Sequence, residues 1–325
     1  MARRSAQISL KLRDKFVFQN KANVQWFPGH MKKGVEQIQA SLHNIDGVLE
    51  IHDARIPFSG RNNQLRDVFH VRPHVLVLNK SDLADLSRKK EIEEKLYSQG
   101  INHVQFTASL AKDIFKVIRK DIVPILLKDI QSRPRFRPDI HNHYNIMVIG
   151  VPNVGKSTML NKLRESYTKQ GKGAAVGASP GVTRSVMNKV RVNFDPDMYV
   201  VDTPGILSPK IGSVDTGMRL CLCDSIPNRL MGEDHIVDYM LYWLNKHHNF
   251  KYVKYYDLKE PCDDVMDFLA QIAIKNQFVM KTKELTHSGG LQYRLNFVRA
   301  ATFVLKDFQR GNLGKIMLDD DYLDF

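Results

Sequence analysis

Residues 146–158 read IMVIGVPNVGKST, an apolar run that leads into a glycine-rich loop. Gly150, Gly155, Lys156 and Ser157 fit the pattern G-x-x-x-x-G-K-S, and a helical pattern, TMLNKLRES, continues from it. In such a loop the glycines let backbone N–H groups encircle phosphates. The lysine places a cation on the β and γ oxygens, and the serine hydroxyl can ligate Mg²⁺ at a helix N-terminus. The stretch therefore predicts a strand, a phosphate-binding loop and a helix, and it indicates nucleotide chemistry without identifying the base.

Two later motifs fit the same chemistry. DTPG (residues 202–205) follows the apolar run MYVV, and in phosphate-loop hydrolases its Asp202 would hold Mg²⁺ through water while the Gly205 N–H senses the γ-phosphate. DTPG is also a common turn, so this interpretation depends on the phosphate loop upstream. Between the two motifs, SPGVTR (residues 179–184) offers Thr183, whose hydroxyl could complete the Mg²⁺ shell when a triphosphate is bound.

A base-reading motif stands upstream of the phosphate loop. VLVLNKSD (residues 75–82) ends in Asp82, which can accept hydrogen bonds from the N1–H and the exocyclic amine of guanine, groups that adenine does not present together. Asn79 can brace the other edge of the guanine ring and neighbouring loops, and Lys80 can lay its aliphatic stem over the base. FTAS (residues 106–109), again at a strand end, offers backbone N–H groups for the guanine O6 at Thr107, Ala108 and Ser109. The two motifs together favour guanine over adenine.

The order of these motifs is reversed relative to an ordinary guanine-nucleotide domain. The base reader comes first, then the phosphate loop, then Thr183 and DTPG. Because the ends of compact domains often lie close together at the surface, the usual ends can be joined and the chain opened elsewhere without loss of the sheet. The sequence therefore predicts a circularly permuted domain, with the proline-punctuated segment 131–145 as the join.

Periodicity extends this prediction to the whole chain. Short Val-, Ile- and Leu-rich runs at 47–53, 74–80 and 103–109 alternate with helical patterns, as in a parallel sheet. From about residue 210 the helical signals dominate, and Leu291, Leu295, Val298, Leu305 and Phe308 predict a last helix that stops near Gly311. We expect an α/β fold: a basic N-terminal segment at 1–24, a circularly permuted phosphate-loop GTPase domain at 25–209 with a mostly parallel sheet flanked by helices, and an all-helical domain at 210–325.

Composition limits the class of protein. The 325 residues carry a formal charge of +13, which favours polyanionic partners such as RNA or acidic lipid head groups without choosing between them. The three cysteines are too few for a disulfide framework, and C-x-C alone lacks the ligands of a zinc site. Since no apolar run reaches about 18 residues, we expect no transmembrane span. The opening MARRSAQISLKLRDKF suits a mitochondrial transit segment, with a basic arm that touches RNA as the alternative.

The chain also resembles a known family, the circularly permuted ribosome-assembly GTPases. The resemblance covers nearly all of the chain after the first twenty or so residues, and it rests on WFPGHMKKG (26–34), DARIPFSGRN (53–62), LNKSDLAD (78–85), VIGVPNVGKST (148–158), PGVTR (180–184), VDTPGIL (201–207) and DFQRGNLGKIMLD (307–319). It implies a factor that binds GTP and GDP with Mg²⁺, hydrolyses GTP slowly alone and faster on ribosomes, and serves maturation of the mitochondrial large ribosomal subunit, its rRNA and proteins, and so mitochondrial translation. It also implies a matrix location, often at the inner-membrane face.

The same resemblance assigns residues. Signalling GTPases place a water-orienting Gln directly after D-x-x-G, whereas this chain has Ile206. In the family the His of W-F-P-G-H-M, here His30, is the proposed substitute. GTPases with Asn at the position of Asn153 often bind K⁺ beside the β and γ phosphates. The expected phosphate-loop contacts are Asn153, Val154, Gly155, Lys156, Ser157 and Thr158.

Two other functions stay open at this stage. One is an RNA-binding or membrane-peripheral scaffold with a structural nucleotide site. A basic stripe at Arg294, Arg299, Lys306, Arg310 and Lys315 would serve this scaffold and a GTPase that acts on RNA equally well. The other is an ATP-dependent kinase, which NKSD argues against. Asp53 and Arg55 receive no chemical role beyond ending a strand.

Overall fold

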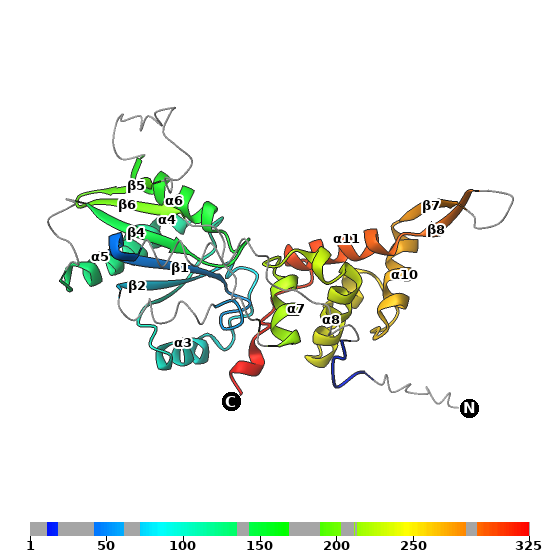
Figure 1. The fold of residues 1–325 in the computed structure, drawn as a ribbon. Coiled ribbons are helices and arrows are strands. Elements are labelled where there is room, and N and C mark those ends of the chain that lie inside the picture. Colours follow the sequence, from blue (N-terminus) through cyan, green and yellow to red (C-terminus); the bar gives the residue numbers. More distant parts are fainter. Residues whose placement is uncertain are drawn as a thin grey trace. The chain divides into compact units, whose positions relative to one another are not determined.

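The computed structural model describes residues 12–18, 42–61, 72–134, 143–168, 189–202, 211, 213–283 and 291–324 (Figure 1). The chain divides into two compact units. One, here named the sheet unit, comprises Gln25–Ile226 and Lys315–Phe325, and the other, here named the helical unit, comprises Met1–Val24 and Pro227–Gly314. Each unit has buried apolar side chains of its own.

The sheet unit is built on six strands in the order β3-β2-β1-β4-β6-β5 (Figure 1). The strands are β1 (Gly47–Asp53), β2 (His74–Asn79), β3 (Val104–Phe106), β4 (Tyr144–Ile149), β5 (Lys189–Phe194) and β6 (Asp197–Asp202). Neighbouring strands from β3 to β6 pair in parallel, and β5 runs antiparallel to β6. The carboxyl ends of the parallel strands therefore share one edge of the sheet, where the predicted motifs begin. The strands expected at 47–53, 74–80 and 103–109 are confirmed, the last in shortened form.

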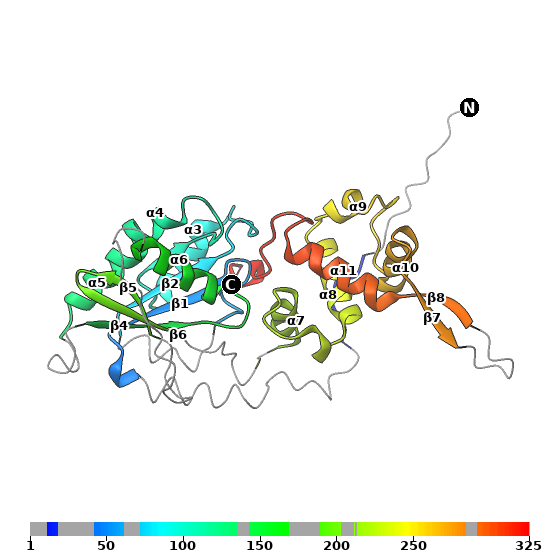
Figure 2. The ribbon, with the colours of Figure 1, turned by 90° about the horizontal axis from the view of Figure 1, so that it is seen from above.

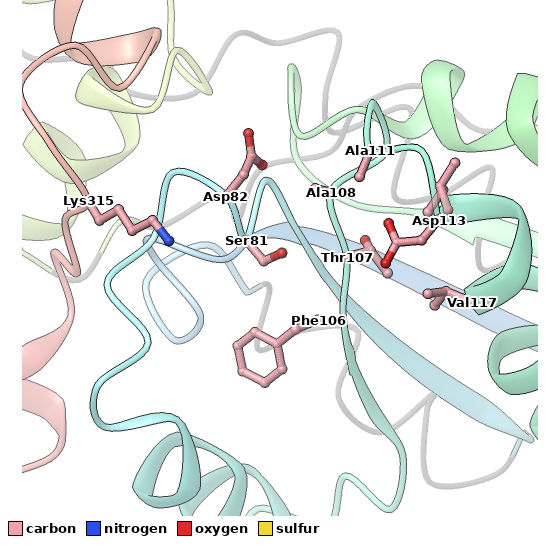
Figure 3. A pocket seen from close by; sticks show the side chains of 10 residues that line it. Ser81, Asp82, Phe106, Thr107, Ala108, Ala111, Asp113, Val117 and Lys315 are labelled. Carbon is pink, nitrogen blue, oxygen red and sulfur yellow. The ribbon is translucent and has the colours of Figure 1, made fainter.

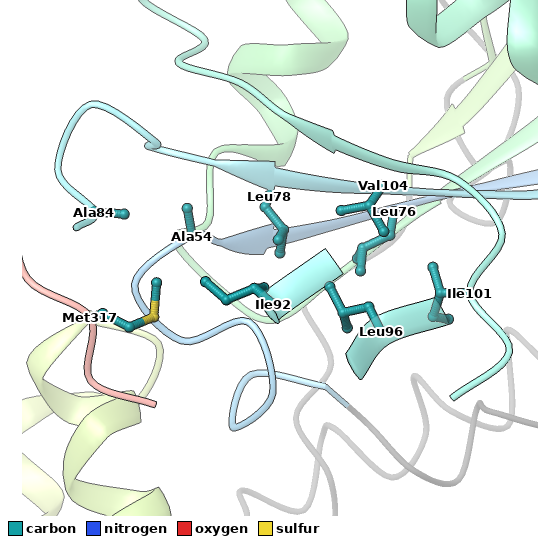
Figure 4. Packing of buried hydrophobic residues seen from close by; sticks show 9 residues of the cluster. All are labelled: Ala54, Leu76, Leu78, Ala84, Ile92, Leu96, Ile101, Val104 and Met317. Carbon is teal, nitrogen blue, oxygen red and sulfur yellow. The ribbon is translucent and has the colours of Figure 1, made fainter. Parts of the chain in front are cut away.

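Helices cover both faces of this sheet. The described helices of the sheet unit are α3 (Lys89–Ser98), α4 (Ile114–Val117), the π-helical turn η4 (Ile118–Ile122), α5 (Val123–Gln131), α6 (Lys156–Thr168) and α7 (Val214–Leu222), with a 3₁₀ turn η2 at Leu42–Asn44. On one face Ile92 and Leu96 of α3, four residues apart, pack against Leu76 and Leu78 of β2 (Figure 4). Figure 1 shows α6 on the opposite face. This two-sided burial explains why β1 and β2 are buried at every residue.

The end of the chain returns to the sheet unit. Residues 315–324, here named the tail, include the 3₁₀ turn η6 (Asp320–Tyr322). Met317 packs in the same apolar cluster as Ala54 and Leu78 (Figure 4). The tail is thus part of the core beside the carboxyl ends of β1 and β2.

The helical unit contains α8 (Glu233–Lys246), α9 (Lys251–Tyr255), α10 (Val265–Lys275) and α11 (Phe297–Gln309), with a 3₁₀ turn η5 at Asn228–Leu230. Helices α8, α10 and α11 pack on one another (Figure 2). The expectation of an all-helical domain is corrected here, because β7 (Val279–Lys283) and β8 (Leu291–Leu295) form an antiparallel pair. Helix α11 therefore starts at Phe297, where the Asn296 side chain accepts a hydrogen bond from the Arg299 N–H at 2.9 Å.

Residues 12–18 pack on the helical unit. Arg13 bonds Asp238 at 2.7 Å and Asp263 at 3.1 Å through its guanidinium group. Phe16 lies edge-on to Tyr239, with 5.0 Å between ring centroids, and Phe18 is buried. This part of the expected N-terminal segment therefore contributes to the fold.

The compact units differ from the expected domains at three places, the first being that residues 1–24 belong to the helical unit. Helix α7 belongs to the sheet unit, although the expected domain boundary lay at 209/210, and the tail leaves the helical domain to which 210–325 was assigned. The join expected at 131–145 lies between α5 and β4, with 135–142 outside the described residues. Among the described residues, none of the helices combines the length and apolarity needed to cross a membrane.

Candidate nucleotide-binding site

The phosphate loop connects β4 to α6 and requires glycine at both of its predicted positions. Gly150 has φ 150°, and a Cβ there would lie 2.1 Å from the Ile51 carbonyl oxygen. Gly155 has φ 97°, and a Cβ there would lie 2.4 Å from Nδ2 of Asn79. Lys156 starts α6 and is buried, and its Nζ donates to the carbonyl oxygens of Gly150 at 3.1 Å and Val151 at 2.9 Å. The lysine amine is thus held inside the loop, at the positive end of a helix, as a phosphate site requires.

Asn79 joins the two predicted motifs. Its Nδ2 donates to the carbonyl oxygen of Val154 in the phosphate loop at 2.8 Å, across 75 positions of sequence. Its Oδ1 accepts from the Ser109 N–H at 3.0 Å, the Ser109 hydroxyl at 2.7 Å and the Thr107 hydroxyl at 3.3 Å. The side chain is buried, so these bonds fix the base-reading, FTAS and phosphate loops in one arrangement.

The base-reading residues line a hollow beside this junction. Asp82, Ser81, Thr107 and Ala108 face a cavity of about 340 Å³, which Lys315 of the tail also lines (Figure 3). Asp82 and Lys156 therefore belong to neighbouring loops braced by one side chain. That the two loops bind one nucleotide together stays a prediction.

Asp53 and Arg55, which had no role in the sequence interpretation, form a buried ion pair that contacts Lys80 of the base-reading loop. Arg55 donates to the two carboxylate oxygens of Asp53 at 2.9 and 2.8 Å, and Nζ of Lys80 lies 3.1 Å from the same carboxylate. Burial alone would raise the pKa of Asp53, but Arg55 and Lys80 outweigh it and lower this pKa to about 2. Lys80 has a positive φ of 58°, and its amine is held by the buried carboxylate of Asp53.

A second unpredicted contact reaches the phosphate loop from α7. Nδ2 of Asn153 donates to the backbone carbonyl of Asp224 at 2.9 Å and to its carboxylate at 3.0 Å. Asp224 lies just after the C-terminal end of α7. At the other end of this helix Ser213 is the N-cap, and its side chain accepts a hydrogen bond from the Thr216 N–H. Burial raises the pKa of Asp224, while Lys80 and Asn153 act in the opposite direction. Sequence reasoning had no signal for this contact, since the partners are 71 residues apart.

The predicted metal ligands are only partly described. Ser157 is exposed in the first turn of α6, and Asp202 ends β6 opposite Val148 of β4, with its side chain outside the described set. A serine hydroxyl and an Asp at this edge are the hard oxygen donors that suit Mg²⁺, which usually takes one or two protein ligands together with substrate phosphates. The described residues contain no group of three or more His, Cys, Asp or Glu that could hold a metal ion. His30, Thr183 and Gly205 lie outside the described residues.

These features define a class: a phosphate-loop GTPase whose base reader precedes its phosphate loop. Residues 145–251 match the family model described as "50S ribosome-binding GTPase". The chain is similar to "Mitochondrial ribosome-associated GTPase 1" of Ictalurus punctatus, with 44% identity over 96% of this chain and 97% of the relative. The relative of the same name in Bos taurus is 41% identical over 98% and 95%. The chain belongs to the family of mitochondrial ribosome-associated GTPases, and it binds guanine nucleotide and hydrolyses GTP.

Two more distant proteins also match the chain. "Ribosome biogenesis GTPase A" of Bacillus pumilus is 28% identical over 91% of this chain and 98% of its own length. The crystal structure of GNP-bound YlqF from T. maritima superposes with a TM-score of 0.56 at 24% identity, covering 88% of this chain and 97% of that one. The latter similarity supports the circularly permuted fold.

Proposed function

We propose that this protein is a GTP-hydrolysing assembly factor for the mitochondrial large ribosomal subunit, which changes its contacts with rRNA and ribosomal proteins through the GTP cycle. The proposal rests on the Asn79–Val154 hydrogen bond, which couples base reading to phosphate binding, and on the relatives' names, which connect the family with mitochondrial ribosomes. The direct test is the GTPase rate with and without mitochondrial large subunits in potassium buffer. Acceleration by the particles supports the proposal, and a rate unaffected by them contradicts it.

In hydrolysis the described loop residues bind and orient the triphosphate. Lys156 would contact the β and γ oxygens, and the Gly205 N–H would detect the γ-phosphate. Ser157, Thr183 and Asp202 are the candidate ligands of Mg²⁺, which when bound would neutralise charge on the phosphate oxygens. Because the segment after Gly205 continues into α7, loss of the γ-phosphate would act on that helix.

His30 is the candidate for positioning the attacking water. Ile206 follows DTPG, and its side chain has no group that can orient water. An imidazole close to the γ-phosphate could do so. His30→Ala should leave GTP affinity near wild type and depress turnover, and an unchanged turnover number would remove His30 from the mechanism.

Asn153 is the candidate ligand for K⁺. Its Nδ2 is committed to Asp224, which turns Oδ1, the atom that can ligate a cation, away from that contact. A monovalent cation there would supply positive charge beside the β and γ phosphates. Replacement of KCl by NaCl should slow hydrolysis, and equal rates in the two salts would contradict this role.

The helical unit offers the surface for RNA. Arg294 lies on β8, and Arg299 and Lys306 lie on the exposed face of α11. The last two line a hollow of about 470 Å³ whose other lining residues are Asn276, Phe278, Thr302 and Phe303. Positive charge beside aromatic rings, with no carboxylate among the described lining residues, suits a phosphate backbone with an unstacked base. Lys315, which the predicted basic stripe included, lies in the sheet unit.

The RNA surface can be tested by charge reversal. Arg299→Glu with Lys306→Glu should weaken binding to mitochondrial rRNA fragments and flatten its salt dependence, whereas Lys259→Glu, at an exposed site of the same unit, should change both less. Equal losses in the two variants would contradict a specific surface. Binding to vesicles of anionic phospholipid that survives the double change would instead support peripheral contact with the inner membrane through another surface.

A matrix location is the remaining part of the proposal. The relatives are named as mitochondrial, and the basic N-terminal segment suits import. Because residues 12–18 pack on the helical unit, a removable leader would have to end before Arg13. N-terminal sequencing of the protein from mitochondria tests this, and a mature terminus beyond Phe18 would contradict it.

A further inference from the structure

The tail pairs with the base-reading loop through the backbone. The Ile316 N–H donates to the Leu83 carbonyl oxygen at 3.1 Å, and the Asp85 N–H donates to the Ile316 carbonyl oxygen at 3.3 Å. Leu83 directly follows Asp82, the residue that reads the base. The two bonds hold both sides of a short stretch that begins one residue after the guanine-reading carboxylate.

A second part of the tail fixes the segment that follows Arg55. The fully buried Asp319 carboxylate accepts from the N–H groups of Phe58 and Ser59, each at 2.8 Å, and from the Ser59 hydroxyl at 2.5 Å. Arg219 of α7 donates to the same carboxylate at 3.1 Å. Phe58 and Ser59 follow shortly after Asp53 in the chain, and Asp53 is the residue that holds Lys80 of the base-reading loop.

Met317 and Leu318, which lie between Ile316 and Asp319, also contact the sheet unit near the base-reading loop. The Leu318 N–H donates to the Arg55 carbonyl oxygen at 2.9 Å, and the Ala54 N–H donates to the Asn79 carbonyl oxygen at 2.7 Å. Met317 packs between them in the apolar cluster (Figure 4). The backbone bonds of Ile316 and Leu318 and the carboxylate bonds of Asp319 therefore all end on residues 79–85 or on the 54–59 segment that supports them.

We propose that residues 315–319 are a positioning segment of the guanine site, and that they set the place of Asp82 and thereby the discrimination between guanine and other purines. Lys315, whose amine points toward Ser81 and Asp82 in Figure 3, begins this segment. Gly314 is the last residue of the helical unit, so this segment is the first part of the tail within the sheet unit. Base recognition in this protein depends on a segment more than 230 positions away in sequence from the motif that performs it.

The test compares GTP with inosine triphosphate (ITP). Inosine lacks the exocyclic amine, so ITP loses one hydrogen bond to Asp82 and keeps every phosphate contact. Ile316→Pro removes the N–H that donates to Leu83, and Asp319→Asn removes the charge that binds the Phe58–Ser59 segment and Arg219. Asp324→Ala, at an exposed residue of the same tail, is the control. Affinities of the full chain are measured by calorimetry, well below the melting temperature of each variant.

The wild-type protein and the control should prefer GTP over ITP by at least about tenfold, the effect of one hydrogen bond to a charged group. In Ile316→Pro this preference should fall about threefold to tenfold, through weaker GTP binding at a nearly constant ITP affinity. Asp319→Asn should fall in the same direction and provides the test if the proline variant does not fold. Equal weakening of both nucleotides, or an unchanged GTP to ITP ratio in both variants, would overturn the proposal. Ribosomes are absent from the assay, so its outcome is independent of the assembly role.

Discussion

Replacement of Asn79 by alanine should separate the two halves of the nucleotide site. The side chain donates to the Val154 carbonyl oxygen at 2.8 Å and accepts from the Ser109 N–H at 3.0 Å, both inside the protein. Alanine fills neither role. The Val154 carbonyl group and the Ser109 N–H would then need other partners, or the loops would have to move toward water.

The magnitude follows from the two groups left behind. A buried polar group without a partner costs about 1–3 kcal/mol, so the pair costs about 2–6 kcal/mol, shared between folding and nucleotide binding. If half of the cost falls on binding, GTP affinity drops by about fivefold to more than a hundredfold, since 1.4 kcal/mol corresponds to about tenfold. Asn79→Asp should also weaken binding, because it keeps the acceptor for Ser109 but sets a carboxylate oxygen against the Val154 carbonyl oxygen.

The assay is calorimetric titration with GTP together with thermal unfolding. Asn245→Ala is the matched control, because Asn245 is equally buried and donates to the Cys262 carbonyl oxygen at 2.9 Å within the helical unit. The control should lose stability and keep its GTP affinity. An Asn79→Ala protein that binds GTP within twofold of wild type would refute the bracing role of this side chain.

Three further outcomes follow from the structure. Gly155→Ala should reduce GTP affinity at least about tenfold by calorimetry, because the new Cβ would lie 2.4 Å from Nδ2 of Asn79 in a backbone conformation that only glycine adopts without strain; near-normal affinity would contradict this. Burial raises the pKa of Asp320 to about 6, so unfolding free energy should fall as pH rises from about 4 to about 6, and Asp320→Asn should flatten this fall and raise the melting temperature above pH 6; identical pH profiles would argue against it. Burial also raises the pKa of Cys223 to about 12, so iodoacetamide at neutral pH should modify Cys262 well before Cys223 in the folded protein by mass spectrometry, whereas simultaneous modification would contradict this burial.

The strands and the nucleotide motifs could be predicted because their signals are local. The phosphate loop needs glycine where φ is positive or the backbone approaches closely, and the sequence shows this directly at Gly150 and Gly155. The buried strands β1 and β2 read as apolar runs with turn signals at their ends. Because each motif follows a predicted strand, the sequence also indicated that the carboxyl ends of these strands meet at one edge of the sheet.

The hairpin in the helical unit was missed because short segments fit two periods. Leu291 and Leu295 are four residues apart, which suits a helix, yet with Tyr293 they also alternate as in a strand. The N-cap residue Asn296 marks the true start of α11 and was the available signal.

Contacts between residues far apart in the sequence could not be predicted, because they leave no local sequence pattern. The Asp319 contact with Ser59 spans 260 positions, and the Asn153 contact with Asp224 spans 71. Inside β1, Glu50 accepts from His52 at 2.8 Å and pairs with His74 at 2.9 Å, all three being buried. The sequence interpretation treated this strand as apolar. A buried polar side chain needs hydrogen-bond partners, and the partner His74 lies on another strand, so the sequence of β1 alone does not reveal the cluster.

The central claim, that two distant parts of the chain grip one guanine nucleotide, is tested most directly by a change of base. Xanthosine triphosphate carries a carbonyl group where guanine has its exocyclic amine, so Asp82→Asn, which offers an amide N–H₂ in place of a carboxylate, should bind it in preference to GTP. Adding Lys156→Ala should abolish tight binding of either triphosphate. A preference for GTP that persists in Asp82→Asn, or triphosphate binding that survives without Lys156, would contradict the account.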